Sequence, residues 1–322
     1  MNDVASNHGI ARHPPAPSRA LASAPHARAL QEAATRVRPY IVIAPALFFL
    51  VTFTYFPLAK VIVGSLYQAG FAGAPATFAG LANYVTVFAD PSFHKALVNN
   101  LVYSVATVVP SIVLALMLAL WLRRSTRINH WLRAALFFPS LVPMVAAATL
   151  WSFLFMPQVG LIDYYLGRAG LPGVNWLGDS HWAMAAIVLV TVWKNAGYYM
   201  LFFLAGLAQI PSELQEAAML DGASGWQRLR RITLPLLRPT LLFVIVLATL
   251  YSVTQVDQVI VMTQGGPSDA TNLLLYYVYE NAYQFGNTGR AMAATVVIVA
   301  LLVLLMAFYF RVLGPREDDA AR

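Results

Sequence analysis

Cysteine is absent from the 322 residues, and charged side chains make up only 11% of them. The first absence excludes disulfide bonds and thiolate metal sites. The second excludes an ordinary water-soluble domain, in which about a quarter of the residues are charged. None of the lysines, Lys60, Lys95 and Lys194, follows a glycine, so the chain lacks a nucleotide-binding P-loop of its own. No histidine precedes a glutamate, which excludes the helical zinc-protease motif.

What is present is apolar: hydrophobic residues fill 59% of the positions. They gather into six stretches, each close to the ~20 residues that a helix needs to cross a bilayer. A soluble protein could bury one such helix in its core, but six in one chain leave no polar faces to cover them. The sequence therefore predicts an all-α integral membrane protein with six transmembrane helices, at residues 40–63, 98–122, 132–156, 184–208, 240–262 and 292–310.

The basic residues give the orientation of these helices. With the amino terminus inside, only Lys95, Arg168 and Arg290 lie in the outer segments. The inner segments carry Arg12, Arg19, Arg28, Arg36, Arg38, Arg123, Arg124, Arg127, Arg133, Arg228, Arg230, Arg231, Arg238, Arg311, Arg316 and Arg322. The positive-inside rule thus predicts that both termini are cytoplasmic. The net charge of +7 is explained by basic residues in the segments that membrane insertion keeps inside, so no nucleic-acid partner is needed to explain it.

Three regions follow from this pattern. Residues 1–38 are rich in Ala, Pro, Arg, Ser and His without an apolar run, which favours a disordered cytoplasmic tail. Their Arg-rich composition loosely resembles an organellar transit peptide, but four prolines interrupt any amphipathic helix. Residues 39–313 form the six-span domain, and residues 314–322 form a second cytoplasmic tail.

An enzymatic alternative comes from the loop after the fourth span. Gly222, Ala223, Ser224 and Gly225 resemble the nucleophile loop of rhomboid intramembrane proteases, which also have six core spans. Ser224, however, lies in a charged loop, and every histidine of the chain lies outside the spans, where no general base would reach a buried nucleophile. A six-span protease and an ion channel remain the alternatives to a transporter subunit.

The loop at residues 210–239 carries the strongest pattern. Ser212 with Gln215, and Ser224 with Gln227, each match a capping box, so the loop predicts two short helices. Gly222 marks the break between them. On the first helix Leu214, Ala217, Ala218 and Asp221 share one face, which offers small side chains to a partner outside the bilayer.

The same loop resembles the EAA loop of permease subunits in binding-protein-dependent ABC importers. The resemblance rests on the positions and spacings of Glu216, Ala217, Ala218, Gly222, Ile232, Thr233, Leu234 and Pro235. Weaker motifs outside the loop, such as Tyr55-Phe56-Pro57 and Gly265-Gly266-Pro267, resemble the carbohydrate and glycerol-3-phosphate branch, which includes the maltose permeases.

The resemblance implies a type I ABC importer permease fold and a non-catalytic role. It further implies a second permease subunit, two ATPase subunits that hold ATP and magnesium, and a periplasmic solute-binding protein that delivers a sugar, polyol or sugar phosphate. The chain itself would bind no cofactor or metal. Glu216 would contact a basic residue of the ATPase, and Gly222 would set the angle of the turn. The coupling residues are then Glu216, Ala217, Ala218, Asp221, Gly222, Ile232, Leu234 and Pro235.

Polar side chains within the spans are candidates for the translocation path, since such residues face a cavity or a partner. Tyr251, Gln255 and Gln258 would share a helical face. Interhelical hydrogen bonding that only fixes the bundle is the competing explanation. The candidates are Lys194, Asn195, Tyr198, Tyr251, Gln255, Asp257 and Gln258.

Overall fold

The computed structural model describes residues 42–68, 70 and 75–313. The predicted tails, residues 1–38 and 314–322, lie outside these residues. The chain divides into two compact units, residues 1–58 and 59–322. A helix runs from Val42 to Gly64 and includes a π-helical turn, η1 (Val51–Tyr55), and α2 (Phe56–Gly64). It presents exposed apolar side chains such as Phe48 and Phe53, which is the surface that lipid would cover.

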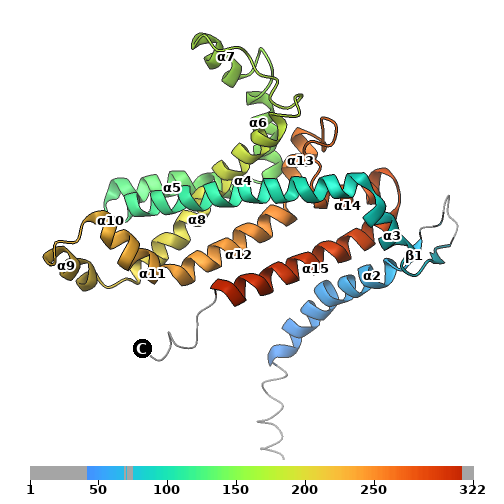
Figure 1. Cartoon of the computed structure of the whole chain (residues 1–322), viewed down its shortest axis with the longest axis horizontal. Coiled ribbons are helices and arrows are strands. Elements are labelled where there is room, and N and C mark those ends of the chain that lie inside the picture. The colour runs from blue at the N-terminus through green and yellow to red at the C-terminus, as the bar shows by residue number, and fades with distance from the viewer. Residues whose placement is uncertain (1–41, 69, 71–74, 314–322) are drawn as a thin grey trace, which may run out of the picture. The chain divides into compact units, whose positions relative to one another are not determined.

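The second unit is almost entirely helical (Figure 1). One short hairpin departs from the all-helical prediction: β1 (Tyr67–Gln68) pairs antiparallel with β2 (Thr77–Phe78). The remaining elements are α3 (Ala82–Ala89), α4 (Pro91–Leu122), α5 (Arg127–Leu141), α6 (Met144–Leu154), α7 (Leu161–Arg168), α8 (Ala183–Ala208), α9 (Ser212–Leu220), α10 (Gly225–Arg228), η3 (Leu229–Thr233), α11 (Leu234–Leu236), α12 (Arg238–Thr254), α13 (Asp257–Met262), α14 (Leu274–Tyr279), η4 (Glu280–Gln284) and α15 (Thr288–Leu313).

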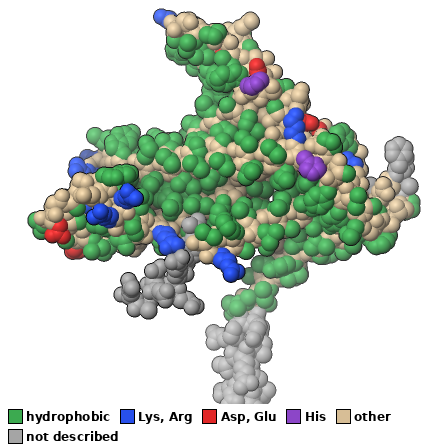
Figure 2. All heavy atoms as spheres, in the orientation of Figure 1, with side chains coloured by type: hydrophobic (Ala, Val, Ile, Leu, Met, Phe, Trp, Pro, Cys, Tyr) green, Lys and Arg blue, Asp and Glu red, His purple; other side chains and the backbone are tan. Residues whose placement is uncertain are grey.

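Among the described residues, five helices are long and apolar enough to cross a bilayer, and the bent pair α5 and α6 makes a sixth if it counts as one span. On the face shown in Figure 2, hydrophobic side chains cover most of the surface and charged side chains are few. This matches a chain whose helices face lipid along their length, because a charge in hydrocarbon is costly.

The second predicted span begins earlier than expected. The helix α4 starts at Pro91 rather than at residue 98, because Asp90 caps it by accepting a hydrogen bond from the Ser92 amide at 2.9 Å. Proline is tolerated at the first helical position, where its missing N–H has no partner to lose. The Asp90 carboxylate also accepts from the Tyr277 hydroxyl at 2.8 Å and pairs with Arg290 at 3.3 Å. One carboxylate thus joins α4, α14 and α15.

The third predicted span, residues 132–156, is not one continuous helix. It is split into α5 and α6, whose axes differ by 97°. Val142 is extended, with φ −72° and ψ 131°, because a residue that precedes proline is pushed out of the helical region. Pro143, in addition, cannot donate the backbone hydrogen bond that a continuing helix requires.

The fifth span is also broken. The helix α12 ends at Thr254, Gln255 is extended, and α13 begins at Asp257. The two outer pieces, α6 and α13, pack in one core cluster around Met144, Val259 and Met262. A separate cluster joins α4, α8 and α12, where the alanines 115 and 119 are fully buried. Small residues allow such close helix contact in membranes.

The helices α5 and α8 lie in close contact at Gly197. A Cβ atom at this position would overlap the Leu136 carbonyl oxygen of α5. Glycine is therefore required here for space, since its backbone is ordinary α-helix.

We expect Gly197→Ala to lower the melting temperature of the purified protein, because the added methyl group forces α5 away from α8, and overpacking costs about 1–3 kcal/mol. Tryptophan fluorescence during thermal unfolding measures this change. Gly167→Ala is the matched control, since nothing lies within 4 Å of its new methyl group. Equal melting temperatures for both variants would contradict the close approach.

Candidate functional site: the coupling segment and the polar core

The first of the two predicted short helices, α9, ends in a left-handed turn at Gly222. Gly222 has φ +76°, and its amide donates to the Met219 carbonyl at 3.1 Å while the Ala223 amide donates to Ala218 at 2.9 Å. These two bonds form a Schellman motif, which satisfies free carbonyls at the end of a helix. No atom lies within 4 Å of a Cβ built on Gly222. The turn thus needs glycine for its backbone conformation rather than for space.

The second helix of the loop begins with the predicted capping box. The Ser224 amide donates to the Gln227 side chain at 2.8 Å, and the Gln227 amide donates to Ser224 Oγ at 3.3 Å. The other predicted box is wrong: Ser212 lies inside α9, Pro211 occupies the cap position, and the cap makes no side-chain hydrogen bond. Proline takes that place because it fixes φ before a helix without needing a donor.

The loop is a closed helical hairpin rather than two independent helices. From α10 the chain continues through the π-helical turn η3 and α11 into α12. Gln215 of α9 donates to the Thr233 hydroxyl of η3 at 3.2 Å, which fastens the two arms together. Ile232 lies in η3, and Leu234 and Pro235 form the start of α11.

The predicted coupling residues lie on different sides of α9. Glu216 lines a cavity of about 580 Å³ together with Ser212, Gln215 and Met219, whereas Leu214 and Ala217 are exposed and absent from that lining. Asp221 and Gly222 line a second cavity with Ile232. Glu216 is itself exposed, and no described cation lies within 4 Å of its carboxylate.

Lys194 donates hydrogen bonds to backbone carbonyl groups at the break in the third span. Its side chain is only 7% exposed, and its ammonium group donates to the carbonyl oxygens of Pro139 at 3.1 Å, Ser140 at 3.4 Å and Val142. These carbonyls lie at the end of α5, where a helix runs out of its own amide donors, although the Pro139 carbonyl also accepts from the Val142 amide at 3.3 Å. A cation at a helix carboxyl terminus is also favoured by the helix dipole. Lys194, which the sequence pattern named as a candidate for the translocation path, thus caps the end of α5.

Asn195 and Tyr198 lie beside Lys194 on α8 but in different surroundings. Asn195 is buried and faces a small polar recess whose lining includes Thr107, Ser111, Thr191 and Ser252. The ring of Tyr198 lies 6.4 Å from that of Tyr251, which joins α8 to α12.

The proposed common face of Tyr251, Gln255 and Gln258 is wrong, because the helix breaks at Gln255 and a helical period does not continue across the break. Gln258 is fully buried, and its amide donates to the Tyr103 hydroxyl at 2.7 Å. Tyr103 in turn lies 2.9 Å from the Thr191 hydroxyl. Gln258 is thus bound within the bundle, while Asp257 is exposed at the first position of α13.

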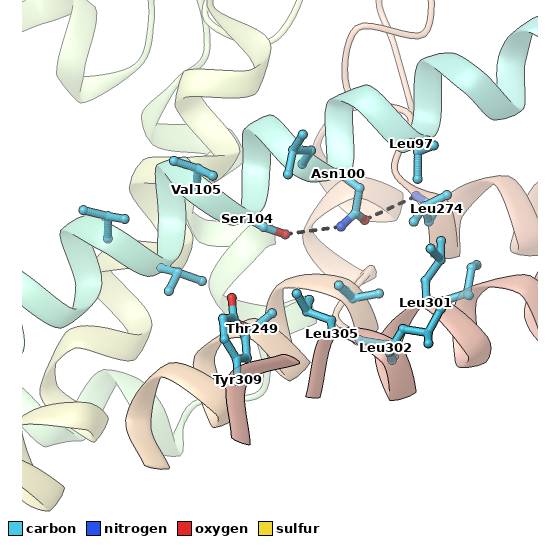
Figure 3. Close-up of a pocket in the computed structure, with 16 residues that line it drawn as sticks. Leu97, Asn100, Ser104, Val105, Thr249, Leu274, Leu301, Leu302, Leu305 and Tyr309 are labelled. Atoms are coloured by element: carbon cyan, nitrogen blue, oxygen red, sulfur yellow. Dashed lines mark hydrogen bonds between the residues drawn. The ribbon is translucent and has the colours of Figure 1, made fainter. Parts of the chain in front are cut away.

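Sequence reasoning missed the partners in this network, Tyr103 and Thr191, and also Asn100, Ser104 and Ser252. A tyrosine or threonine within an apolar run gives no signal by itself, since its partner lies on another helix. Asn100 donates to Ser104 Oγ at 3.3 Å and accepts from the Leu274 amide at 3.4 Å (Figure 3). Ser104 also accepts from Ser252 at 2.8 Å.

Asn100 and Ser104 line an apolar groove of about 490 Å³ between α4, α12 and α15 (Figure 3). Leucine and valine side chains provide most of its lining, including Leu97, Val105 and Leu301. Its amide and hydroxyl groups are largely engaged with each other, so the groove resembles a surface for hydrocarbon more than one for sugar hydroxyls.

Comparison with known proteins decides between the alternatives. Residues 111–319 match the family described as the binding-protein-dependent transport system inner membrane component. The chain belongs to this family. It is a multi-pass inner-membrane permease subunit, and the intramembrane protease and the channel are thereby set aside. The permease is non-catalytic and binds no cofactor, because ATP hydrolysis resides in a separate subunit of these importers.

Several relatives match over nearly their whole length. The sn-glycerol-3-phosphate transport system permease protein UgpA of Agrobacterium fabrum is 35% identical, over 87% of this chain and 96% of the relative. The sulfoquinovosyl glycerol transport system permease protein SmoG of the same organism is 31% identical, over 88% and 92%. A chain of a bacterial ABC transporter involved in alginate import superposes with a TM-score of 0.76 at 23% identity, over 88% and 97%. The last likeness confirms the ABC importer permease fold.

We expect Lys194→Met to destabilise the permease, because partly buried carbonyl groups at the break would lose a donor, at about 1–3 kcal/mol each. Lys194→Arg retains donors and charge and should recover part of the loss. Melting temperatures in detergent provide the measurement, with Lys95→Met, whose ammonium bonds an exposed carbonyl, as control. Unchanged stability combined with a raised transport KM would instead assign Lys194 to substrate.

Proposed function

We propose that the permease forms half of the path through which an ATP-driven importer takes up a glycerol- or sugar-based solute. A second permease would form the other half, two ATPase subunits would supply the energy, and a periplasmic binding protein would deliver the solute. The segment at residues 210–239 would transmit ATPase movement to the spans. The observation that carries this proposal is the closed helical hairpin of that segment, in a chain that belongs to the importer family.

The exposed face of α9 and α10 supports a protein partner. Leu220 is 90% exposed and Trp226 is 67% exposed, and Leu214 is also exposed. Such apolar groups outside the long spans indicate a protein or membrane surface that covers them. Ala217 lies on the same exposed side and is small enough for close approach. The unpaired carboxylate of Glu216 offers a charge to a basic group of the ATPase.

The substrate class follows from the relatives. UgpA is named for sn-glycerol 3-phosphate and SmoG for sulfoquinovosyl glycerol, and both solutes contain glycerol and an acidic group. We infer a small polyol or sugar derivative of this kind for the present permease. Lys194 and Gln258 are engaged within the bundle, so the predicted path residues that remain available for that role are Asn195, Tyr198, Tyr251, Gln255 and Asp257.

The orientation of the permease yields a direct test. Arg123, Arg124 and Arg133 line a cavity together with α9, so the basic α4–α5 turn and the coupling segment lie at one end of the bundle. The positive-inside rule assigns this end, and with it both chain termini, to the cytoplasm. We expect alkaline phosphatase fused after Arg322 to be inactive and a fluorescent protein fused there to be bright. The opposite pair of signals would show an inverted topology.

We expect Gly222→Val and Glu216→Lys to abolish substrate uptake by the complete transporter while leaving membrane insertion intact. Valine in a left-handed turn costs about 1–2 kcal/mol and would redirect α10. Lysine at position 216 would replace attraction by repulsion, and losing a desolvated charge pair costs about 2–5 kcal/mol. Uptake of radiolabelled glycerol 3-phosphate, membrane abundance and ATPase retention on pull-down are the measurements.

Two controls match these variants in chemistry. Gly170→Val places the same residue in an equally open turn, with φ +74°, just after the end of α7. Glu213→Lys reverses a charge on α9 outside the Glu216 cavity. We expect both controls to retain uptake. Normal uptake and ATPase retention in the two coupling variants would disprove the coupling role of this segment.

A further inference from the structure

The cavity between the α4–α5 turn and α9 has two chemically different walls. One wall is apolar and consists of side chains from the end of α8, the linker that follows it and α9: Leu204, Leu207, Ala208, Ile210 and Met219. The other wall is basic and consists of Arg123, Arg124 and Arg133. With a volume of about 580 Å³, the cavity lies where two long apolar helices, α4 and α8, end.

One of the three arginines is engaged in hydrogen bonds to the backbone, whereas the side chains of the other two have no partner among the described residues. Arg133 donates to the Leu122 carbonyl at 3.2 Å and to the Arg124 carbonyl at 3.3 Å, which fixes the turn that follows α4. The side chains of Arg123 and Arg124 make no hydrogen bond or ion pair with any other described residue. Both are exposed, and they converge on the same cavity.

Glu216 is the acidic side chain in the lining, and Ser212, Gln215 and Thr233 complete its polar part. Three guanidinium groups against one carboxylate leave an excess of positive charge. A small soluble anion would use the guanidinium groups but would gain nothing from the leucine wall. A neutral lipid or an apolar side chain would cover the leucines but leave the charge unpaired.

We propose that this cavity binds the headgroup of an anionic phospholipid. The phosphate would pair with Arg123 and Arg124, and the glycerol backbone and the first acyl carbons would follow Leu204 and Leu207 toward the bilayer. Basic pockets at the ends of transmembrane helices suit such headgroups, because each arginine near the surface contributes about 1 kcal/mol to the attraction. Lipid binding at this site requires only that the chain is a membrane protein, which its family establishes, and does not depend on the proposed coupling role.

Occupancy of the site bears on coupling, and this step rests on the proposed function. Gln215 bridges α9 to Thr233, and both residues line the cavity. A bound headgroup would therefore contact the coupling segment from the side of the spans, opposite Ala217, and help to hold α9 in position for the ATPase.

Binding can be measured on the full-length permease alone, which separates this test from the proposed coupling role. Native mass spectrometry in detergent, with titrated phosphatidylglycerol or phosphatidylcholine, gives the apparent Kd of each lipid. We expect phosphatidylglycerol to bind more tightly. The double variant Arg123→Ala/Arg124→Ala should weaken it about 30-fold, which corresponds to two arginines at the contribution given above. Glu216→Gln should strengthen it, because the carboxylate opposes the phosphate.

The matched control is Arg230→Ala/Arg231→Ala, which removes equal charge from η3 outside this cavity and should change binding less than threefold. An equal loss in the control would reduce the effect to general surface charge and overturn the proposal. Equal affinity for the two lipids would do the same. Displacement of the lipid by millimolar inorganic phosphate or by glycerophosphoglycerol would assign the cavity to free anions instead. Melting temperatures confirm that each variant is folded.

Discussion

A peptide backbone in hydrocarbon has no water to satisfy its N–H and C=O groups, and this constraint governs the bundle. It is most demanding where Pro143 interrupts the third span, because α5 ends there and its last carbonyl groups lack the amide donors of a continuing helix, apart from the Val142 amide that donates to Pro139 at 3.3 Å. Lys194 supplies the missing donors from α8. Its charge is tolerated at 7% exposure because the carbonyl oxygens replace water. Gly197, one turn further along α8, brings α5 close enough for this contact.

The described residues form three core clusters, and the pieces of the two broken spans contribute to different ones. The pieces beyond the breaks, α6 and α13, pack together with the first half of α8 and with Tyr103. The second half of α8 packs with α4 and α12 in another cluster. The hydrogen bonds from Gln258 to Tyr103 and from Tyr103 to Thr191 run across the helices at the level of the breaks. Polar contacts of this kind position helices in membranes, where hydrophobic attraction between helices is absent.

The segment at residues 210–239, for which we propose a coupling role, follows a different rule, because its form is set almost wholly by neighbours in sequence. A left-handed glycine, a capping box and one side-chain bond from Gln215 to Thr233 give a rigid hairpin. This local stability allows an exposed, partly apolar surface such as Leu220 and Trp226 to keep its shape. A rigid element that ends directly in α12 can pass movement to a span, and the same element forms one wall of the basic cavity.

The sequence by itself determined the membrane class, the approximate spans, the family and the turn at Gly222, because each depends on composition or on residues a few positions apart. The tertiary structure alone decided that Lys194 caps α5, that Gln258 bonds Tyr103 and that Asn195 faces a recess. These contacts join helices far apart in the chain, and an apolar run does not record which helix its polar residues face. The break at Pro143 lies between these two cases. The proline is visible in the sequence, but hydropathy averaged along a span does not record a change in the direction of the helix axis.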